Sequence, residues 1–123
     1  MKPFPFSPAR RDLVIKQGAT WIYPITWERP AGTPVDISGF TARMQIRDDA
    51  YSSTVLVDMT TANGRITIDG PAGTVTLILA DDLTAALSFR GTAAYDLELV
   101  QASPRWVVPL IGGSVTLMPE VTR

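Results

Sequence analysis

The stretch FTARMQIR, residues 40–47, decides the fold class of this chain. Its apolar residues occupy every second position, at Phe40, Ala42, Met44 and Ile46, and polar or charged residues fill the positions between them. Successive side chains of a β-strand point to opposite faces of the sheet. The alternation therefore predicts a strand with one buried face and one face in water.

The same two-residue period recurs along the rest of the chain. It predicts further strands at residues 21–27, 54–59, 66–68, 75–79, 95–99, 106–110 and 115–117. Prolines, glycines and an asparagine mark the turns between them, at residues 30–34, 63–64, 69–73 and 103–104. We therefore expect an all-β protein, an antiparallel β-sandwich or small barrel of about seven to nine strands.

A single segment has helical character. Residues 81–87 begin with two aspartates, which suit a helix N-terminus, and the spacing of Leu83 and Leu87 lets both point the same way. The segment predicts one short helix of one or two turns.

Proline and glycine refine the expected strands. Pro24 and Pro109 lie inside strand patterns and lack the N–H that a ladder needs, so their strands should lie at a sheet edge or carry a bulge. The pair Gly112-Gly113 predicts a bulge or a tight bend between the last two strands. Residues 36–39 predict a turn held by an Asp or Ser side chain, which delivers Phe40 to the core.

Tyr95 begins a predicted strand shortly after the predicted helix, and two roles fit it. Immunoglobulin-like sandwiches carry a tyrosine corner, in which the phenol hydroxyl bonds to backbone a few residues upstream and pins a crossover between the sheets. The alternative is an ordinary aromatic side chain of the core. The residues alone leave both roles open.

Composition limits the available chemistry. The chain has 123 residues, no His and no Cys, and 11 Lys+Arg against 12 Asp+Glu. The length suits one domain. Missing His and Cys exclude an imidazole base, a thiolate nucleophile, disulfides, and imidazole or thiolate metal ligands. A net charge of −1 offers no basic field for phosphates, so we expect no nucleic-acid partner.

Targeting and membrane signals are also missing from the sequence. Three prolines in the first eight residues prevent the apolar helix of a signal peptide. The longest apolar runs are far too short to span a bilayer. We expect synthesis in a cytoplasm and no membrane partner.

Paired acidic residues do not predict a catalytic centre. Asp48-Asp49 follows a strand end, and Asp81-Asp82 opens the predicted helix. Adjacent strand residues point to opposite faces, so neither pair forms a two-carboxylate site by itself. The chain also has no calcium loop of the EF-hand type and no phosphate-binding glycine loop. We expect no catalytic residue, no cofactor and no metal.

The N-terminal segment differs from the rest of the chain. Residues 1–12 are rich in proline and predict an extended arm, and residues 13–123 predict the β-sandwich domain. The arm is either a frayed terminus or a device whose Phe4 and Phe6 dock on a neighbouring subunit. Two phenylalanines are unusual side chains to leave in water, which keeps the second possibility open beside the first.

Two further groups of residues are candidates for binding. Arg43 and Arg47 share the wet face of the strand at residues 40–47, where they form a basic strip or simply a solvated face. Aromatic faces stack on sugars, so a carbohydrate platform is possible at the tryptophans, Trp21, Trp27 and Trp106. Their alternation with other apolar residues makes core packing the better explanation for at least two of them.

Several motifs together resemble a family. They are QGATW at 17–21, TW at 26–27, VDISGFTARMQIR at 35–47, TANGRI at 61–66, GTV at 73–75, YDLEL at 95–99, GSV at 113–115 and EVTR at 120–123. This set resembles a small structural protein common in tailed bacteriophages and prophages. More loosely, it resembles the immunoglobulin-like N-terminal domain of phage baseplate and receptor-binding components, such as the baseplate upper protein. The resemblance covers about residues 13–123 and does not include the arm.

The resemblance implies an immunoglobulin-like sandwich that is part of a virion. It implies a non-enzymatic protein of the tail or neck region, or one associated with fibres, present in multiple copies. Its partners would be portal or neck, tail or fibre components and further copies of itself. The alternatives are a capsid decoration protein, a receptor- or carbohydrate-binding module, and an inhibitor that acts on a host system inside the cell.

Overall fold

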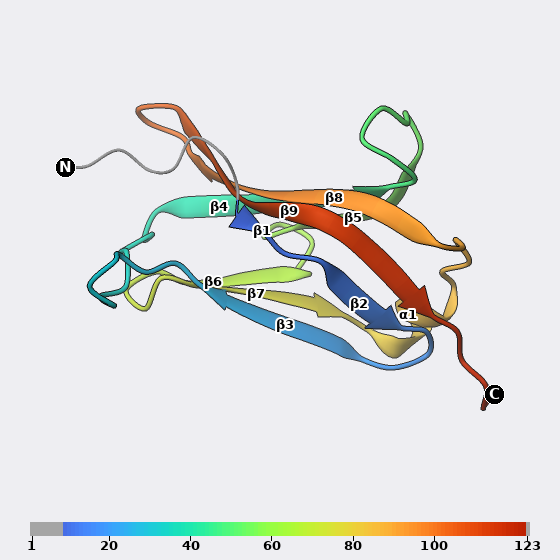
Figure 1. The fold of residues 1–123 in the computed structure, drawn as a ribbon. Helices are drawn as coiled ribbons and strands as arrows, with labels where there is room; N and C mark the ends of the chain where they lie inside the picture. The colour runs from blue at the N-terminus through green and yellow to red at the C-terminus, as the bar shows by residue number, and fades with distance from the viewer. Residues whose placement is uncertain (1–8, 123) are drawn as a thin grey trace.

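The computed structural model describes residues 9–122, which fold as two β-sheets packed face to face (Figure 1). Over these residues the chain forms nine strands and one helix: β1 (Ala9–Arg10), β2 (Leu13–Lys16), β3 (Trp21–Thr26), β4 (Phe40–Arg47), β5 (Val55–Thr60), β6 (Ile66–Asp69), β7 (Thr74–Leu79), α1 (Asp81–Ala85), β8 (Thr92–Gln101) and β9 (Trp106–Met118). The expected antiparallel β-sandwich with one short helix is confirmed.

The strands divide between a larger and a smaller sheet. Sheet A has the order β1-β9-β8-β4-β5, with β2 also paired to β9, and sheet B has the order β3-β7-β6. Only β1 and β2 run parallel to their neighbour β9, and every other described pair is antiparallel. The two sheets therefore form the two layers of a β-sandwich.

The core lies between the two sheets. The inward residues of β7, Val75, Leu77 and Leu79, are fully buried, and so are Leu97 and Leu99 of β8 in the opposite sheet. Each strand contributes every second side chain, as the period of two requires. Burial of this apolar surface is the main force that holds the sheets together.

Both prolines within strands lie where the missing N–H does least harm. Pro24 is on β3, an edge strand of sheet B. Pro109 pairs with Glu98, and the register shifts there because Leu97 pairs with Ile111. Leu110 is therefore the extra residue of a β-bulge. Both predictions about proline are confirmed.

The prediction of a break at Gly112-Gly113 is wrong, because β9 continues unbroken through both glycines. The bulge lies at Leu110 instead. Gly113 serves a close approach: a β-carbon there would lie 2.7 Å from the Arg11 carbonyl oxygen. The glycine therefore lets Arg11 and Asp12, which link β1 to β2, lie close against β9.

Sheet pairing begins at Ala9, four residues before the domain boundary expected at Leu13. Ala9 and Arg10 pair with β9, and the Arg11 N–H donates to the Gly112 carbonyl at 2.9 Å. The sandwich therefore includes the last residues of the segment expected to be an arm. Residues 1–8, with Phe4 and Phe6, lie outside the described residues.

Tyr95 is a core aromatic with a long-range hydrogen bond. Its hydroxyl donates to the Arg11 carbonyl, 84 residues upstream, so the tyrosine corner is wrong here. Burial raises the pKa of the Tyr95 phenol well above its ordinary value, which keeps the hydroxyl protonated as a donor. The Ser114 backbone N–H donates to the Asp12 carboxylate at 3.1 Å and lowers the pKa of that group. These contacts hold the N-terminal segment on sheet A.

The turn at residues 36–39 forms as expected. Asp36 Oδ1 accepts hydrogen bonds from the Ser38 N–H at 2.9 Å and from the Ser38 hydroxyl at 2.6 Å. The Phe40 N–H donates to the Ile37 carbonyl, and β4 starts at Phe40. The side chain of Asp36 thus sets the start of the strand that decided the fold.

Helix α1 ends at Ala85, two residues before the predicted end, and carries one polar side chain to the interior. Thr84 is fully buried, the only polar side chain buried to this degree between residues 9 and 122. Its hydroxyl oxygen accepts the Gly18 N–H at 3.1 Å and lies 2.8 Å from the Ala19 carbonyl oxygen, to which it donates. The helix is thereby tied to the connection between β2 and β3.

Replacing Thr84 with valine should lower the free energy of unfolding by about 2 kcal/mol, because it leaves the partly buried Gly18 N–H and Ala19 carbonyl without this partner. Thr84→Ser keeps the hydroxyl and should lose less. Urea titrations of both variants measure the difference. A larger loss for Thr84→Ser than for Thr84→Val would show that the methyl group, not the hydroxyl, makes the contribution.

Candidate functional site: the outer face of sheet A

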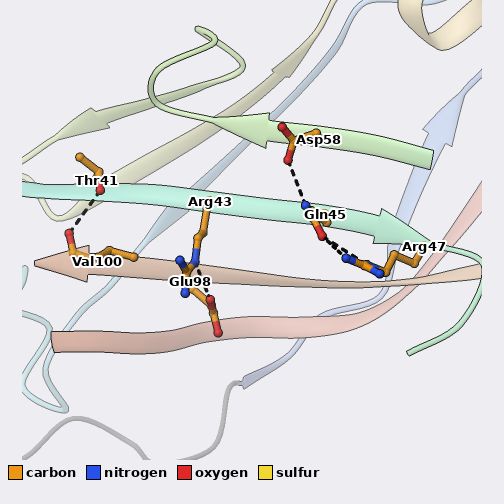
Figure 2. A network of polar contacts seen from close by, with 7 residues as sticks. All are labelled: Thr41, Arg43, Gln45, Arg47, Asp58, Glu98 and Val100. Atoms are coloured by element: carbon orange, nitrogen blue, oxygen red, sulfur yellow. Dashed lines mark hydrogen bonds and ion pairs between the residues drawn. The ribbon is translucent and has the colours of Figure 1, made fainter. Parts of the chain in front are cut away.

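The polar face of β4 forms the floor of the candidate site (Figure 2). Arg43, Gln45 and Arg47 project from β4 to the outside of sheet A, since their neighbours Ala42, Met44 and Ile46 point into the core. The adjacent strands add acidic side chains on the same face: β8 contributes Asp96 and Glu98, and β5 contributes Asp58. Three strands therefore build one polar surface.

Hydrogen bonds across the strands fix most of these side chains. Arg43 Nε donates to Glu98 Oε1 at 2.8 Å, and Gln45 Nε2 donates to Asp58 Oδ1 at 3.3 Å (Figure 2). The guanidinium of Arg47 donates through Nη2 to Gln45 Oε1 at 2.6 Å. Such cross-strand partners position side chains before any ligand arrives.

Two adjoining hollows lie on this surface. One, of about 360 Å³, is lined by Arg43, Met44, Gln45, Asp58, Thr60, Asp96 and Glu98. The other, of about 150 Å³, is lined by Gln45, Arg47, Asp49, Ala50, Ala94, Tyr95 and Asp96. They share Gln45 and Asp96, so we treat them as one continuous depression, the sheet A trough.

The trough carries an excess of negative charge. Four carboxylates line it against two guanidinium groups, which gives a net charge of −2. Arg43 is paired with Glu98, whereas Arg47 donates to the neutral acceptors Gln45 and Ser52. Asp96 makes no hydrogen bond or ion pair with the described part of the chain. Partial burial and the neighbouring Glu98 raise the pKa of Asp96 above its ordinary value.

Asp96→Asn should stabilise the fold near neutral pH by about 0.5 kcal/mol, a small gain because water screens an exposed carboxylate. A raised pKa means that the folded state holds the proton more tightly, so the cost appears as pH rises through that pKa. The variant and the parent protein should therefore unfold at the same denaturant concentration near about pH 3 and differ near neutral pH. A gain that persists at the acidic pH would contradict this origin.

Of the four predicted partner-binding residues, Arg43 and Arg47 lie within the described residues, and Phe4 and Phe6 lie outside them. Arg43 and Arg47 do share one exposed face, but the two carboxylates of β8 make this face acidic rather than a basic strip. The period of two at residues 95–99 places Asp96 and Glu98 on the opposite side of their strand from Tyr95, Leu97 and Leu99. It did not indicate that β8 lies beside β4, which depends on pairing between residues 55 positions apart, such as Arg43 and Glu98.

The loop between β4 and β5 presents an aromatic residue that the sequence analysis missed. Tyr51 is 98% exposed at this loop, which projects beyond the sheets (Figure 1). The Tyr51 N–H donates to Asp49 Oδ1 at 2.8 Å, and Arg47 Nη1 donates to the Ser52 carbonyl at 2.7 Å. The loop is therefore preorganised, and one end of the trough, at Asp49 and Ala50, adjoins it.

The tryptophans do not form one platform. Trp21 and Trp27 pack partly buried against the core, and Trp21 stacks on Tyr23 with ring centroids 5.9 Å apart. Trp106 is on sheet A, 39% exposed, with its ring centroid 6.5 Å from that of Phe40. Core packing of two of the three tryptophans is confirmed.

Comparison with known proteins adds no further assignment. No protein-family model and no curated protein sequence matches this chain. Between residues 9 and 122, no three Asp or Glu residues cluster in a way that could hold a metal ion. Over the same residues, the one helix is too short and too polar to cross a bilayer.

Proposed function

We propose that this protein is a non-enzymatic structural component of a tailed bacteriophage particle, present in several copies in the tail or neck region or associated with fibres. The observation that carries the proposal is where the fold places the motifs that resemble those of the phage structural proteins. They meet one another and close the ends and edges of the sandwich, as expected of a structural module.

The first pair of motifs comes from the two ends of the chain. Gln17, in QGATW, accepts the N–H of Glu120, in EVTR, on its side-chain oxygen at 2.9 Å. The Gln17 amide also donates to the Leu87 carbonyl at 2.8 Å. A single side chain therefore joins the start of the domain, its end and the segment after α1.

A second motif closes a sheet edge. In TANGRI, Asn63 Nδ2 and Arg65 Nη1 donate to the Asp58 carbonyl of edge strand β5, at 3.0 and 2.9 Å. The Thr60 N–H donates to Asn63 Oδ1 at 3.0 Å. Exposed strand edges invite uncontrolled pairing, so these bonds suit a protein that is packed at high local concentration.

The outer face of sheet B also suits close packing. The outward positions of β3 and β7 are uncharged: Ile22, Pro24, Thr26, Thr74, Thr76 and Ile78. Ile22 is 60% exposed. Strand β6 adds one acidic side chain to this face, Asp69 opposite Thr74. A face with so few charges contacts a neighbouring subunit with little like-charge repulsion, and repeated weak contacts gain strength from symmetry.

Mass spectrometry of purified particles from the strain that encodes this chain tests the proposal. We expect its peptides at a level that matches several copies per particle. Absence from intact particles would overturn it. A cryo-EM map of the same particles separates a tail or neck position from capsid decoration.

A further inference from the structure

We infer that the sheet A trough receives residues 1–8 of a neighbouring copy of this chain. This contact deepens the proposed function and rests on its multi-copy assembly. Residues 1–8 have the sequence MKPFPFSP and lie outside the described residues. The chemistry of the trough, the charge of the segment and the place where the segment joins the sandwich support the assignment.

The first argument is hydrogen bonding. Pro3, Pro5 and Pro8 favour a polyproline II course, in which the backbone carbonyls have no internal partner. Arg43 uses only Nε in its bond to Glu98, which leaves both Nη groups to donate to such carbonyls. A guanidinium plane also stacks on an aromatic ring, as Phe4 or Phe6 would offer.

The second argument is charge. Residues 1–8 contain one charged side chain, Lys2, so the side chains of the segment carry a net charge of +1. The trough carries −2, and the Asp96 side chain makes no hydrogen bond or salt bridge within residues 9–122, although the charges of Arg43 and Arg47 act on it. Opposite charge steers the segment to this face and opposes docking on a basic one.

The third argument is position. Ala9 pairs with Ile111, Ile111 pairs with Leu97, and Leu97 pairs with Met44, so Ala9, to which the segment is joined, lies level with Met44 in the larger hollow of the trough. Eight residues in a polyproline II course span about 25 Å. The length is therefore sufficient to reach across a subunit boundary.

The same length also allows the segment to dock in the trough of its own chain, which is the main alternative. The distance from β1 to β4 is three strand spacings, about 14 Å. To follow that path the segment must turn across β9 and β8 immediately before Ala9, at Pro8, which restricts the backbone of Ser7. A proline-rich segment prefers to continue straight, so we assign the contact to a neighbour.

The binding test uses the full chain with Phe4→Ala and Phe6→Ala as acceptor, and a synthetic peptide of residues 1–8 as probe. We expect amide NMR shifts at Arg43, Gln45 and Asp96. The same peptide with both phenylalanines changed to alanine should bind at least about ten-fold more weakly. No shift, or shifts confined to another surface, would overturn the site.

A charge control distinguishes specific binding at the trough from general electrostatic attraction to an acidic protein. Asp96→Asn in the acceptor should weaken peptide binding several-fold. The double variant Asp81→Asn and Asp82→Asn, at the acidic start of α1, removes more negative charge elsewhere and should leave binding unchanged. Equal weakening by both would show that only net charge matters and would contradict the assignment.

Sedimentation of the unmodified full chain decides between a neighbour and the same copy. We expect association that grows with protein concentration and that is lost in the Phe4→Ala, Phe6→Ala variant. A chain that binds the peptide but stays monomeric at all concentrations docks its own segment and overturns the contact between copies. Both measurements use purified protein, so their failure is independent of whether particles contain the chain.

Discussion

Leu97→Ala should lower the free energy of unfolding by about 3 kcal/mol, the range expected when a fully buried leucine leaves a cavity. Leu97 has no exposed surface, and its strand β8 lies between β4 and β9 in sheet A. Met44 of β4 and Ile111 of β9 flank it across the two ladders, and both are buried. The paired strands fix the surrounding backbone, so the site has little freedom to collapse into the space.

Ile22→Ala is the matched control for Leu97→Ala. It removes a side chain of the same size from the outer face of sheet B, where Ile22 is 60% exposed. We expect a loss below about 1 kcal/mol, because little apolar surface returns to water. Urea unfolding of both variants, followed by tryptophan fluorescence, gives the two values. Similar losses would mean that the interior between the sheets is not close-packed.

The period of two predicted the local structure well, because it reflects burial on one face of each strand. The strand at residues 40–47 has both ends where they were expected, and the strand expected at 54–59 forms one residue later, at Val55–Thr60. The predicted strand ends were less accurate where buried residues continue beyond the clearly alternating part of the sequence. The strand expected at 95–99 extends over Thr92–Gln101.

Features that depend on a distant partner could not be predicted from the local pattern. Gly113 indicated a bend, but the groups that require a glycine there are on Arg11 and Asp12, about a hundred residues away. Tyr95 left a local corner and a core position open, and its acceptor is the distant Arg11 carbonyl. The local pattern could not decide either feature for the same reason: the N-terminal strands return to pair with β9.

The candidate site has the same limitation. The alternation of β4 correctly placed Arg43 and Arg47 on one exposed face. The sign of the net charge on that face depends on which strand lies beside β4. Pairing with β8 brings Asp96 and Glu98 next to the arginines, so the face is an acidic trough and not the basic strip that was one of its two possible roles. Net charge and residue type alone contain no information about this pairing.

Gly73→Ala should destabilise the protein by about 3 kcal/mol, through two additive effects. Gly73 has a φ of 65°, a left-handed conformation that disfavours side chains. A β-carbon there would also lie 2.6 Å from the Val35 carbonyl oxygen and 2.9 Å from the Trp27 carbonyl oxygen. These neighbours are backbone atoms, so the loop between β3 and β4 would have to move.

That movement would reach the core. The Trp27 N–H donates to the Gly73 carbonyl at 2.9 Å, and the Val35 N–H donates to the Trp27 carbonyl at 2.9 Å. Val35 is 5% exposed, and Ile37 two residues later is fully buried. Displacing the loop therefore withdraws apolar side chains from the space between the sheets and breaks backbone hydrogen bonds at the same end of the sandwich.

Gly32→Ala separates the two effects. Gly32 has a φ of 87°, also left-handed, but a β-carbon there would meet no atom within 4 Å. The Gly32→Ala variant should lose only the part of the unfolding free energy that comes from the left-handed backbone, about 1 kcal/mol. Thermal and urea unfolding of the two variants give the difference, which measures the close approach at Gly73. Equal losses of unfolding free energy in the two variants would mean that the loop between β3 and β4 moves without cost. The crossing of residues 27–35 over the turn before β7 would then contribute nothing to the stability of the sandwich.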